Sequence, residues 1–415
     1  MGPGFRRGDN FVFSVALRRH CEEASPTKQS MGGNRCVCSS GLLGWTAPDG
    51  IMMCQNEVVG DLKQRRPSVE KLIRVGVDTS KSVFQLHGVD GAEAPVLRRK
   101  LRRDRFLAFF AGLAPVRIGM EACGASHYWA RELRALGHEV VLIPPQYVKP
   151  YVQRGKSDAA DAEAICEAMS RPKLAKNLVP VKNAEQQAAQ MLMKLRAQFI
   201  ARRTQLSNSI RGFAAEFGFT APKGFSRLGA LLAEIGADAG LPELAREMFE
   251  RLADDYARID AEVAKLDIKL MELHSASEVS RRLATIPGIG PVGAMLLTIK
   301  AADATAFKSG RSFAAWAGLT PKNHSTAGKN RLGVITRAGN EMLRSVLVAG
   351  ATAVIQHMRR GGKHVWPWLE ALIARKPPKL VAIALANKLA RIAWKLMVSG
   401  ERYRPRAALP GVTQL

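Results

Sequence analysis

Two short, mainly apolar runs that each end in an acidic residue place the strongest constraint on how this chain can fold. The first run covers residues 73–78 and the second covers residues 116–121. Runs of this length are typical of buried strands. A helix predicted over residues 158–169 begins with two more acids three positions apart, so their side chains share one helix face. We expect folding to bring four carboxylates to one point, those of Asp78, Glu121, Asp158 and Asp161.

The order of the predicted strands in this region is typical of a ribonuclease H-like sheet. Three strands come first, and the turn Asp90-Gly91 joins the second to the third as a hairpin. Two further strands follow, each preceded by a helix. The predicted strands cover residues 73–78, 82–89, 95–101, 116–121 and 139–143, and the intervening helices cover residues 103–112 and 126–136. We therefore predict an α/β fold for this part of the chain.

The chain beyond this region is predicted to be helical. From residue 183 to residue 275, apolar residues such as Met191, Phe213 and Val263 recur at spacings of three and four, as in amphipathic helices. A turn at residues 222–224 divides this stretch into two long helices, which we interpret as a coiled-coil arm with an oligomer contact. Residues 380–398 form a strongly apolar helix, which is expected to be buried or at a partner interface.

These patterns divide the chain into five parts. We predict a disordered or over-long N-terminal extension at 1–70, an α/β catalytic domain at 71–180, a helical or coiled-coil segment at 181–278, an all-α C-terminal domain at 279–400 and a tail at 401–415. The first part shows no sustained period and is assigned no function. Met31, Met52 and Met53 are alternative starts within it.

The charge of the chain favours a polyanionic partner. The 62 Lys and Arg residues outnumber the 36 Asp and Glu residues, which gives a net charge of +26. Such a balance is typical of nucleic-acid binding that releases counterions and therefore weakens with salt. The alternative is a basic soluble protein such as a ribosome-associated factor.

Cysteine usage and hydropathy favour a cytoplasmic, nucleoid-associated bacterial protein. Six cysteines do not make a disulfide scaffold in a chain this long, and Cys36 and Cys38 lack a matching second pair of zinc ligands. Cys123 and Cys166 are expected to be reduced thiols of the core. No apolar run reaches the roughly 20 residues that a membrane-spanning helix needs. We therefore expect no membrane partner.

The acidic residues predict a metal site in this basic chain. Carboxylate oxygens are the ligands that Mg²⁺ prefers, and two such ions can clamp the attacking and leaving oxygens of a phosphodiester. The pattern therefore indicates metal-dependent DNA strand chemistry. The alternative is that a strand-end Asp caps a turn, and that Asp158 and Asp161 only favour the helix dipole. Lys156, just before their helix, could contact a phosphate.

A second motif, Ile-Pro-Gly-Ile-Gly-Pro at residues 286–291, precedes an apolar helix at residues 292–299. Two glycines, Gly288 and Gly290, would expose backbone N–H groups at the start of that helix. Such donors suit a DNA phosphate without reading bases. We interpret the motif as a helix-hairpin-helix element, and the alternative is an ordinary Pro-Gly turn.

A third motif is a cationic loop, residues 318–329, that carries Ser325. A serine hydroxyl attacks phosphorus poorly unless it is deprotonated and the phosphate charge is offset. His324, Lys329 and Arg331 are near enough in sequence to help, and Arg337 follows as a further candidate for nucleic-acid binding. The alternative is a solvated hydroxyl or a turn residue.

Together these motifs resemble the DEDD transposases of the insertion-sequence one-ten family, closest to its eleven-eleven subgroup, with Piv-type DNA invertases as relatives. The resemblance covers roughly residues 72–400. It rests on residues 75–81, 119–124 and 156–162, the Ile-Pro-Gly-Ile-Gly-Pro turn, and residues 315–321 and 325–335. The order and spacing of these blocks are more specific than any one of them.

The resemblance implies a RuvC-like domain in which Asp78, Glu121, Asp158 and Asp161 bind Mg²⁺. It also implies a C-terminal transposase domain in which Ser325 forms a covalent link to DNA. The two sites would form a composite centre across subunits of a homodimer or homotetramer, and a structured bridge RNA would pair with donor and target DNA. One departure is Ala327, where the family often has glycine, and Thr326 offers a second hydroxyl.

We therefore predict a transposase, a site-specific DNA recombinase that excises and inserts its own element. Two alternatives remain open at this point. One is a RuvC-like Holliday-junction nuclease, which uses water as the nucleophile and needs no serine. The other is a non-catalytic basic protein that binds nucleic acid and would tolerate loss of the four acids.

Overall fold

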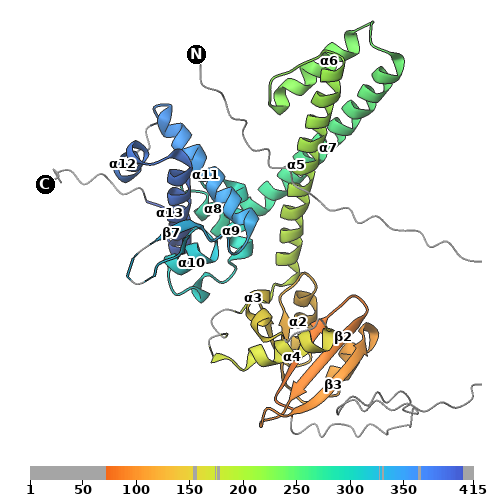
Figure 1. Ribbon diagram of the computed structural model, residues 1–415, viewed down its shortest axis with the longest axis vertical. Helices are drawn as coiled ribbons and strands as arrows, with labels where there is room; N and C mark the ends of the chain where they lie inside the picture. The colour runs from red at the N-terminus through yellow and green to blue at the C-terminus, as the bar shows by residue number, and fades with distance from the viewer. Residues whose placement is uncertain are drawn as a thin grey trace, which may run out of the picture. The chain divides into compact units, whose positions relative to one another are not determined.

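The computed structural model describes residues 72–152, 157–172, 174, 178–326, 328–329, 331–362 and 366–404 (Figure 1). The extension predicted over residues 1–70, with its alternative starts, lies outside the described residues, as do Lys156, Ala327 and most of the predicted tail. The predicted combination of an α/β N-terminal sheet with a mainly helical C-terminal region is confirmed, but the C-terminal region is not all-α as predicted, because it also contains a two-stranded antiparallel hairpin.

The N-terminal sheet has five strands in the order β3-β2-β1-β4-β5. Strands β1, β2 and β3 pair antiparallel, whereas β4 and β5 run parallel to β1. The strands are β1 (Arg74–Thr79), β2 (Val83–Val89), β3 (Pro95–Arg102), β4 (Arg117–Glu121) and β5 (Glu139–Ile143). Because β1 and β4 are parallel neighbours, their C-terminal ends, which carry Asp78 and Glu121, lie at the same edge of the sheet.

Short helices cover the sheet. They are α1 (Phe106–Ala111), α2 (Ser126–Ala135), α3 (Pro145–Val148) and α4 (Asp158–Met169), with 3-10 turns at Arg103–Arg105 and Lys149–Tyr151. Side chains alternate between the two faces of a strand. On β1, Val75 and Val77 therefore pack into an aromatic core with Phe106 and Trp129, whereas Gly76 on the other face lies against α4.

Two long helices make up most of the next segment, α5 (Ala184–Glu216) and α7 (Glu243–Ala276), with α6 (Leu228–Ala237) and a 3-10 turn at Phe225–Arg227 between them (Figure 1). Ion pairs join Arg196 to Asp267 and Arg203 to Asp260. From the first pair to the second, the residue number rises by seven on α5 and falls by seven on α7. The two helices therefore run antiparallel. Phe213 and Met191 of the predicted apolar stripe are exposed rather than packed.

The C-terminal region is built around one hydrophobic cluster. Its helices are α8 (Glu278–Leu283), α9 (Pro291–Lys300), α10 (Gly310–Trp316), α11 (Glu341–Arg359), α12 (Pro367–Arg375) and α13 (Pro378–Ser399), with a 3-10 turn at Ala304–Ala306 and a hairpin of β6 (Pro321–Asn323) and β7 (Leu332–Ile335). The predicted apolar helix corresponds to α13, which buries Val381, Leu385 and Leu389 on one stripe. No helix in the described parts of the chain is long and apolar enough to cross a membrane.

Candidate active site

Helix α4 lies directly on the backbone of β1, and Gly76 makes this approach possible. A Cβ atom at Gly76 would stand 2.2 Å from the carbonyl oxygen of Ala162 and 2.5 Å from the amide nitrogen of Cys166. Any larger residue would push the helix away from the sheet. The guanidinium of Arg74 donates from Nε to the carbonyl oxygen of Cys166 at 3.1 Å, which also holds α4 to β1.

The first turn of α4 brings two acids to the end of β1. Ser157 caps the helix, because its hydroxyl accepts a hydrogen bond from the amide of Ala160 at 3.2 Å. One carboxylate oxygen from each of Asp78, Asp158 and Asp161 can be chosen so that all three lie within 4.8 Å of one another. The structure therefore gathers three of the four predicted metal ligands from two elements.

Glu121 is the fourth predicted ligand, and it is not one of these three gathered residues. It ends β4, the parallel neighbour of β1. Burial and then the charge of Asp161 raise the pKa of Glu121. The Glu121 carboxyl is thus influenced by the negative charge of Asp161, although it is not among the three carboxylates that lie within 4.8 Å of one another.

The acidic cluster carries an electrostatic cost. The pKa of Asp78 is raised from 3.8 to about 6, first by burial and then by the charges of Asp161, Asp158 and Glu121. Among the described residues, none of the three clustered aspartates takes part in an ion pair. Converging carboxylates without a basic partner are a donor set that fits a divalent cation such as Mg²⁺, Mn²⁺ or Ca²⁺.

Ser325 lies in the loop between β6 and β7, a hairpin of the C-terminal region that is distant in sequence from the α/β sheet. Its backbone N–H donates to Oδ1 of Asn323 at 3.0 Å, and its hydroxyl donates to the same oxygen. The amide of Arg331 donates to the Ser325 hydroxyl oxygen at 3.1 Å. The hydroxyl is therefore oriented by a partner two residues before it and a partner across the hairpin.

The basic residues predicted near Ser325 occupy this hairpin or follow it. The amide of His324 donates to the carbonyl oxygen of Arg331 at 2.8 Å, which closes the hairpin beside Ser325. Lys329 and Arg331 are exposed. Arg337 adopts a φ of 55°, an uncommon conformation for a residue other than glycine. Thr326, the alternative nucleophile, is bridged to Lys329 through the backbone.

The Ile-Pro-Gly-Ile-Gly-Pro turn joins α8 to α9, and its two glycines have different surroundings. Gly288 has a φ of 87°, and a Cβ atom there would lie 2.9 Å from the carbonyl oxygen of Gly350 on α11. Packing against α11 therefore accounts for Gly288. Gly290 is exposed and immediately precedes the first residue of the ten-residue helix α9. A Cβ atom at Gly290 would enter open space, with no neighbouring atom within 4 Å.

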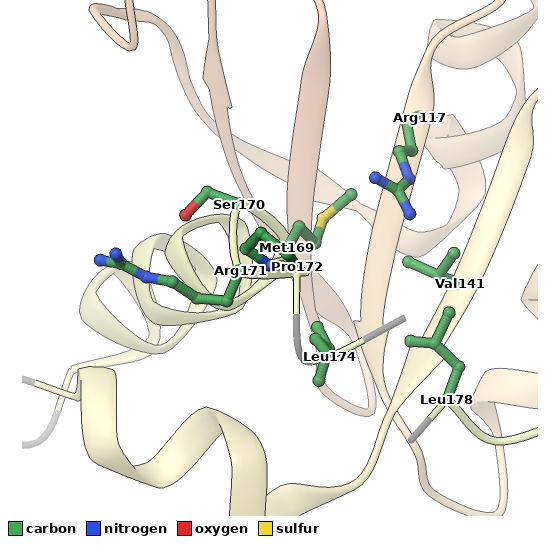
Figure 2. Close-up of a pocket in the computed structure, with 8 residues that line it drawn as sticks. All are labelled: Arg117, Val141, Met169, Ser170, Arg171, Pro172, Leu174 and Leu178. Carbon is green, nitrogen blue, oxygen red and sulfur yellow. The ribbon is translucent and has the colours of Figure 1, made fainter. Parts of the chain in front are cut away.

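A small pocket of about 130 Å³ lies at the other end of the sheet (Figure 2). Arg117 begins β4, whereas Glu121 ends it. The two arginines in the lining are paired, Arg117 with Glu139 and Arg171 with Glu167. Figure 2 shows the Met169 side chain between them. The pocket thus presents no uncompensated charge and is separate from the acidic cluster.

Two kinds of site residue were not predicted from the sequence. Asn323 lies in the predicted cationic loop without a predicted role, although an Asn two residues before a Ser is the pattern of an Asx-turn. Gly76 and Gly119 were predicted only as members of strands, and glycine inside a strand often marks a close approach of another backbone. Both signals are present in the sequence, but neither identifies the partner.

Comparison with known proteins identifies the class of this chain. Residues 75–217 match the DEDD transposase family of IS110, and residues 280–366 match the family described as Transposase IS116/IS110/IS902 family. A Sinorhizobium fredii protein named as a transposase is 61% identical over 353 residues, which are 85% of this chain and 91% of that protein. A Pseudomonas aeruginosa protein named as a family 20 transposase is 45% identical over 337 residues, 80% of this chain and 99% of its own.

A third relative is the transposase for insertion sequence element IS1111A of Coxiella burnetii. It is 35% identical over 358 residues, which are 86% of this chain and 98% of the relative. The fold and these similarities define a transposase, an enzyme of DNA transposition and recombination. The chain belongs to the IS110 family of insertion-sequence transposases, which confirms the family resemblance seen in its motifs.

Proposed function

We propose that this transposase excises and inserts its element by a Mg²⁺-dependent reaction that passes through a covalent phosphoserine–DNA intermediate. The observation that carries the proposal is the convergence of Asp78, Asp158 and Asp161 within 4.8 Å. These carboxylates would hold the metal, with Glu121 as the adjacent fourth ligand. Bound there, Mg²⁺ supplies positive charge that offsets the negative charge of the reacting phosphodiester.

Ser325 is the proposed nucleophile. The Ser325 hydroxyl loses its proton as Oγ forms a bond to phosphorus, the bond from phosphorus to one deoxyribose oxygen breaks, and that oxygen takes up a proton to become a hydroxyl. The reverse reaction with a hydroxyl of another strand rejoins the DNA and frees the serine. The hydrogen bonds from Ser325 to Asn323 and from Arg331 to Ser325 support this role, because they orient the hydroxyl. Lys329 and Arg331 would offset phosphate charge.

The acidic cluster and Ser325 belong to different parts of the chain, and we propose that they meet as a composite centre across subunits of a homodimer or homotetramer. The arm formed by α5 and α7 is the proposed oligomer contact and coiled coil. Apolar side chains that this chain leaves exposed support that role, among them Met191, Phe213 and Leu244, which are 67%, 47% and 69% exposed. The five predicted parts of the chain remain its proposed domains.

A structured bridge RNA would supply sequence choice by pairing with donor and target DNA, while the protein contacts the backbone. The net charge of +26 supports a polyanionic partner. The exposed backbone at Gly290, at the start of α9, would contact a phosphate as part of a helix-hairpin-helix element. Lys156, Lys329, Arg331 and Arg337 are proposed phosphate contacts as well.

The test compares Ser325→Ala and Asp158→Ala with Thr326→Ala in a recombination assay with purified protein, DNA and guide RNA. We expect the first two variants to lose recombination while they retain nucleic-acid binding, and the third to remain active. Trapped protein–DNA adducts should disappear in Ser325→Ala. Adducts that persist in Ser325→Ala and vanish in Thr326→Ala would assign the nucleophile to Thr326.

The same experiment separates the two alternative functions. A junction-resolving nuclease would cleave DNA in the Ser325→Ala variant and give no adduct, because water is its nucleophile. A non-catalytic binding protein would show neither cleavage nor adduct and would bind DNA no worse after loss of the acids. The convergence of three carboxylates without an ion pair favours the metal-dependent enzymes over the binding protein.

A further inference from the structure

We infer that an open groove between the start of α10 and the C-terminal half of α13 binds the phosphate backbone of duplex DNA. The groove has a volume of about 810 Å³, and its lining includes the cations Arg311, Lys388, Arg391 and Lys395 but no acidic residue. The two helices pack in one hydrophobic cluster. The groove is therefore a feature of a single packed body, and no residue of the Ser325 hairpin belongs to its lining.

The cations of α13 form a row. Lys388, Arg391 and Lys395 are separated by three and four residues, so they share one face of the helix. At a rise of 1.5 Å per residue, the row extends about 10 Å. A strand of B-DNA carries one charge per roughly 3.4 Å of its axis, so a row laid along that axis spans about three phosphate intervals. Arg311 faces this row from α10.

The charge of the groove is largely uncompensated. Arg311, Arg391 and Lys395 take part in no ion pair within the described chain. By contrast, Arg258, Lys265 and Lys269 on α7 each pair with an acid of their own helix. Repulsion among the groove cations favours an anionic partner that spans them.

Glycine at the start of α10 and an anchored tryptophan on α13 build the groove. A Cβ atom at Gly310 would lie 3.1 Å from the ring of Trp394 and 3.3 Å from the backbone of Arg391, so the helix start packs closely on α13. The indole Nε1 of Trp394 donates to the carbonyl oxygen of Ala304 at 3.0 Å. The groove walls are thus fixed before a ligand arrives.

The lining favours duplex DNA over single-stranded nucleic acid. Proteins that bind single strands stack bases on exposed aromatic rings. Trp394 is the aromatic residue of this lining, and it is only partly exposed and bonded to Ala304. Ser309, the hydroxyl-bearing residue, caps α10 by accepting from the amide of Ser312 at 3.2 Å. The groove therefore offers charges for phosphates rather than a platform for bases or a dedicated contact to a ribose hydroxyl.

The groove is a surface that the proposed catalytic roles do not use. Its test is therefore a binding measurement on the full chain with EDTA present, in which neither Ser325 nor the acidic cluster needs to act. The variant is the triple R311Q/R391Q/K395Q. The matched control is R258Q/K265Q/K269Q, which removes an equal number of positive charges, three, from exposed, ion-paired positions on α7. Lys388 is left unchanged because its ammonium lies 3.9 Å from the centre of the Trp368 ring.

Affinity is measured for a labelled DNA duplex and for a labelled RNA hairpin at several salt concentrations. We expect the groove triple to bind the duplex at least about 10-fold more weakly than the unchanged protein at roughly 0.1 M salt. The slope of log affinity against log salt should also become shallower by about 2.7, which is about 0.9 for each lost phosphate contact. The control triple should stay within about twofold of the unchanged protein. Thermal unfolding checks that both triple variants fold. The variant R311Q/R391K/K395Q, which returns one positive charge to the groove, should recover part of the duplex binding.

A loss of duplex binding specific to the groove triple supports the inference, whether or not RNA binding falls with it. Unchanged duplex binding overturns it. A loss confined to the RNA hairpin also overturns it and assigns the groove to RNA. Equal losses in the two triples overturn it as well, because the effect would then come from net charge alone.

Discussion

Gly76 and Gly119 lie side by side on the parallel strands β1 and β4, and helix α4 crosses over both of them. The two residues are register partners in the sheet. A Cβ atom at Gly76 would meet the α4 backbone at Ala162, whereas a Cβ atom at Gly119 would meet the sulfur of Met169 at 2.2 Å. This pair of glycines therefore sets how close α4 lies to the sheet, and hence where its first turn places Asp158 and Asp161.

Replacing Gly76 by alanine should destabilise the α/β sheet and displace the acidic turn. The added methyl would stand against backbone atoms, which cannot rotate away, so we expect a loss of about 1–3 kcal/mol in the free energy of unfolding. Gly119→Ala should cost less, because the Met169 side chain is flexible. Urea unfolding measures both. Gly91→Ala is the control, since no atom lies within 4 Å of its Cβ position. An equal loss of unfolding free energy in Gly91→Ala and Gly76→Ala would show that close packing on α4 is not the cause.

The metal-free protein should be stabilised by Asp78→Asn in a pH-dependent manner. The pKa of Asp78 is about 6 in the folded chain against an ordinary value of 3.8, so the folded state holds the proton more tightly than the unfolded state. Its ionisation therefore lowers stability as pH rises from about 4 to about 6, and the penalty is complete above about 6. With EDTA present, the Tm of Asp78→Asn should exceed that of the unchanged protein most at about pH 7.

The Tm difference should shrink as pH falls through about 6 and vanish below about 4, where Asp78 is protonated in both the folded and the unfolded chain. A difference that stays constant over this whole range would show that packing rather than charge causes it. Saturating divalent metal should reduce the advantage of the variant, because only the unchanged protein gains stability by binding the ion.

Divalent-metal binding should depend more on Asp161 than on Glu121. Asp161 belongs to the group of ligand atoms within 4.8 Å, and Glu121 does not. We expect Asp161→Asn to weaken the affinity for Mn²⁺, used as a probe, by at least about 10-fold, and Glu121→Gln to weaken it less. Isothermal titration calorimetry measures both affinities. Equal losses would mean that Glu121 joins the closest group once an ion is bound.

Asn323 should act as a positioning residue for Ser325. Its Oδ1 accepts hydrogen bonds from both the backbone amide and the hydroxyl of Ser325. Asn323→Ala removes the oxygen to which the Ser325 hydroxyl donates, although the amide of Arg331 still donates to that hydroxyl. Adduct formation in a single turnover should therefore slow by about 10- to 100-fold. Asn323→Asp keeps an acceptor oxygen and should recover much of the rate. DNA affinity serves as the control, and a parallel loss of binding would indicate that the hairpin itself has been disrupted.

Short-range patterns in the sequence were sufficient for much of the fold. The alternation of apolar runs and the Asp90-Gly91 hairpin predicted the strand order of the sheet, because side-chain period and turn chemistry are local properties. The acids at the ends of β1 and β4 could be expected to meet, since parallel neighbours share an edge. The family could be identified because its motifs keep their order along the chain.

Tertiary structure decided what local patterns cannot encode. The stripe containing Met191 and Phe213 predicted amphipathic helices with an oligomer contact. Only the structure shows that both side chains stay exposed in this chain, since a pair of helices offers less partner surface than the width of its apolar stripes. The roles of Gly76, Gly288 and Asn323 depend on atoms from distant or folded-back segments. By itself, the sequence determined which elements form and which charges they carry, because those depend on near neighbours. Only three-dimensional packing decided how closely α4 approaches the sheet and which carboxylates therefore share one point.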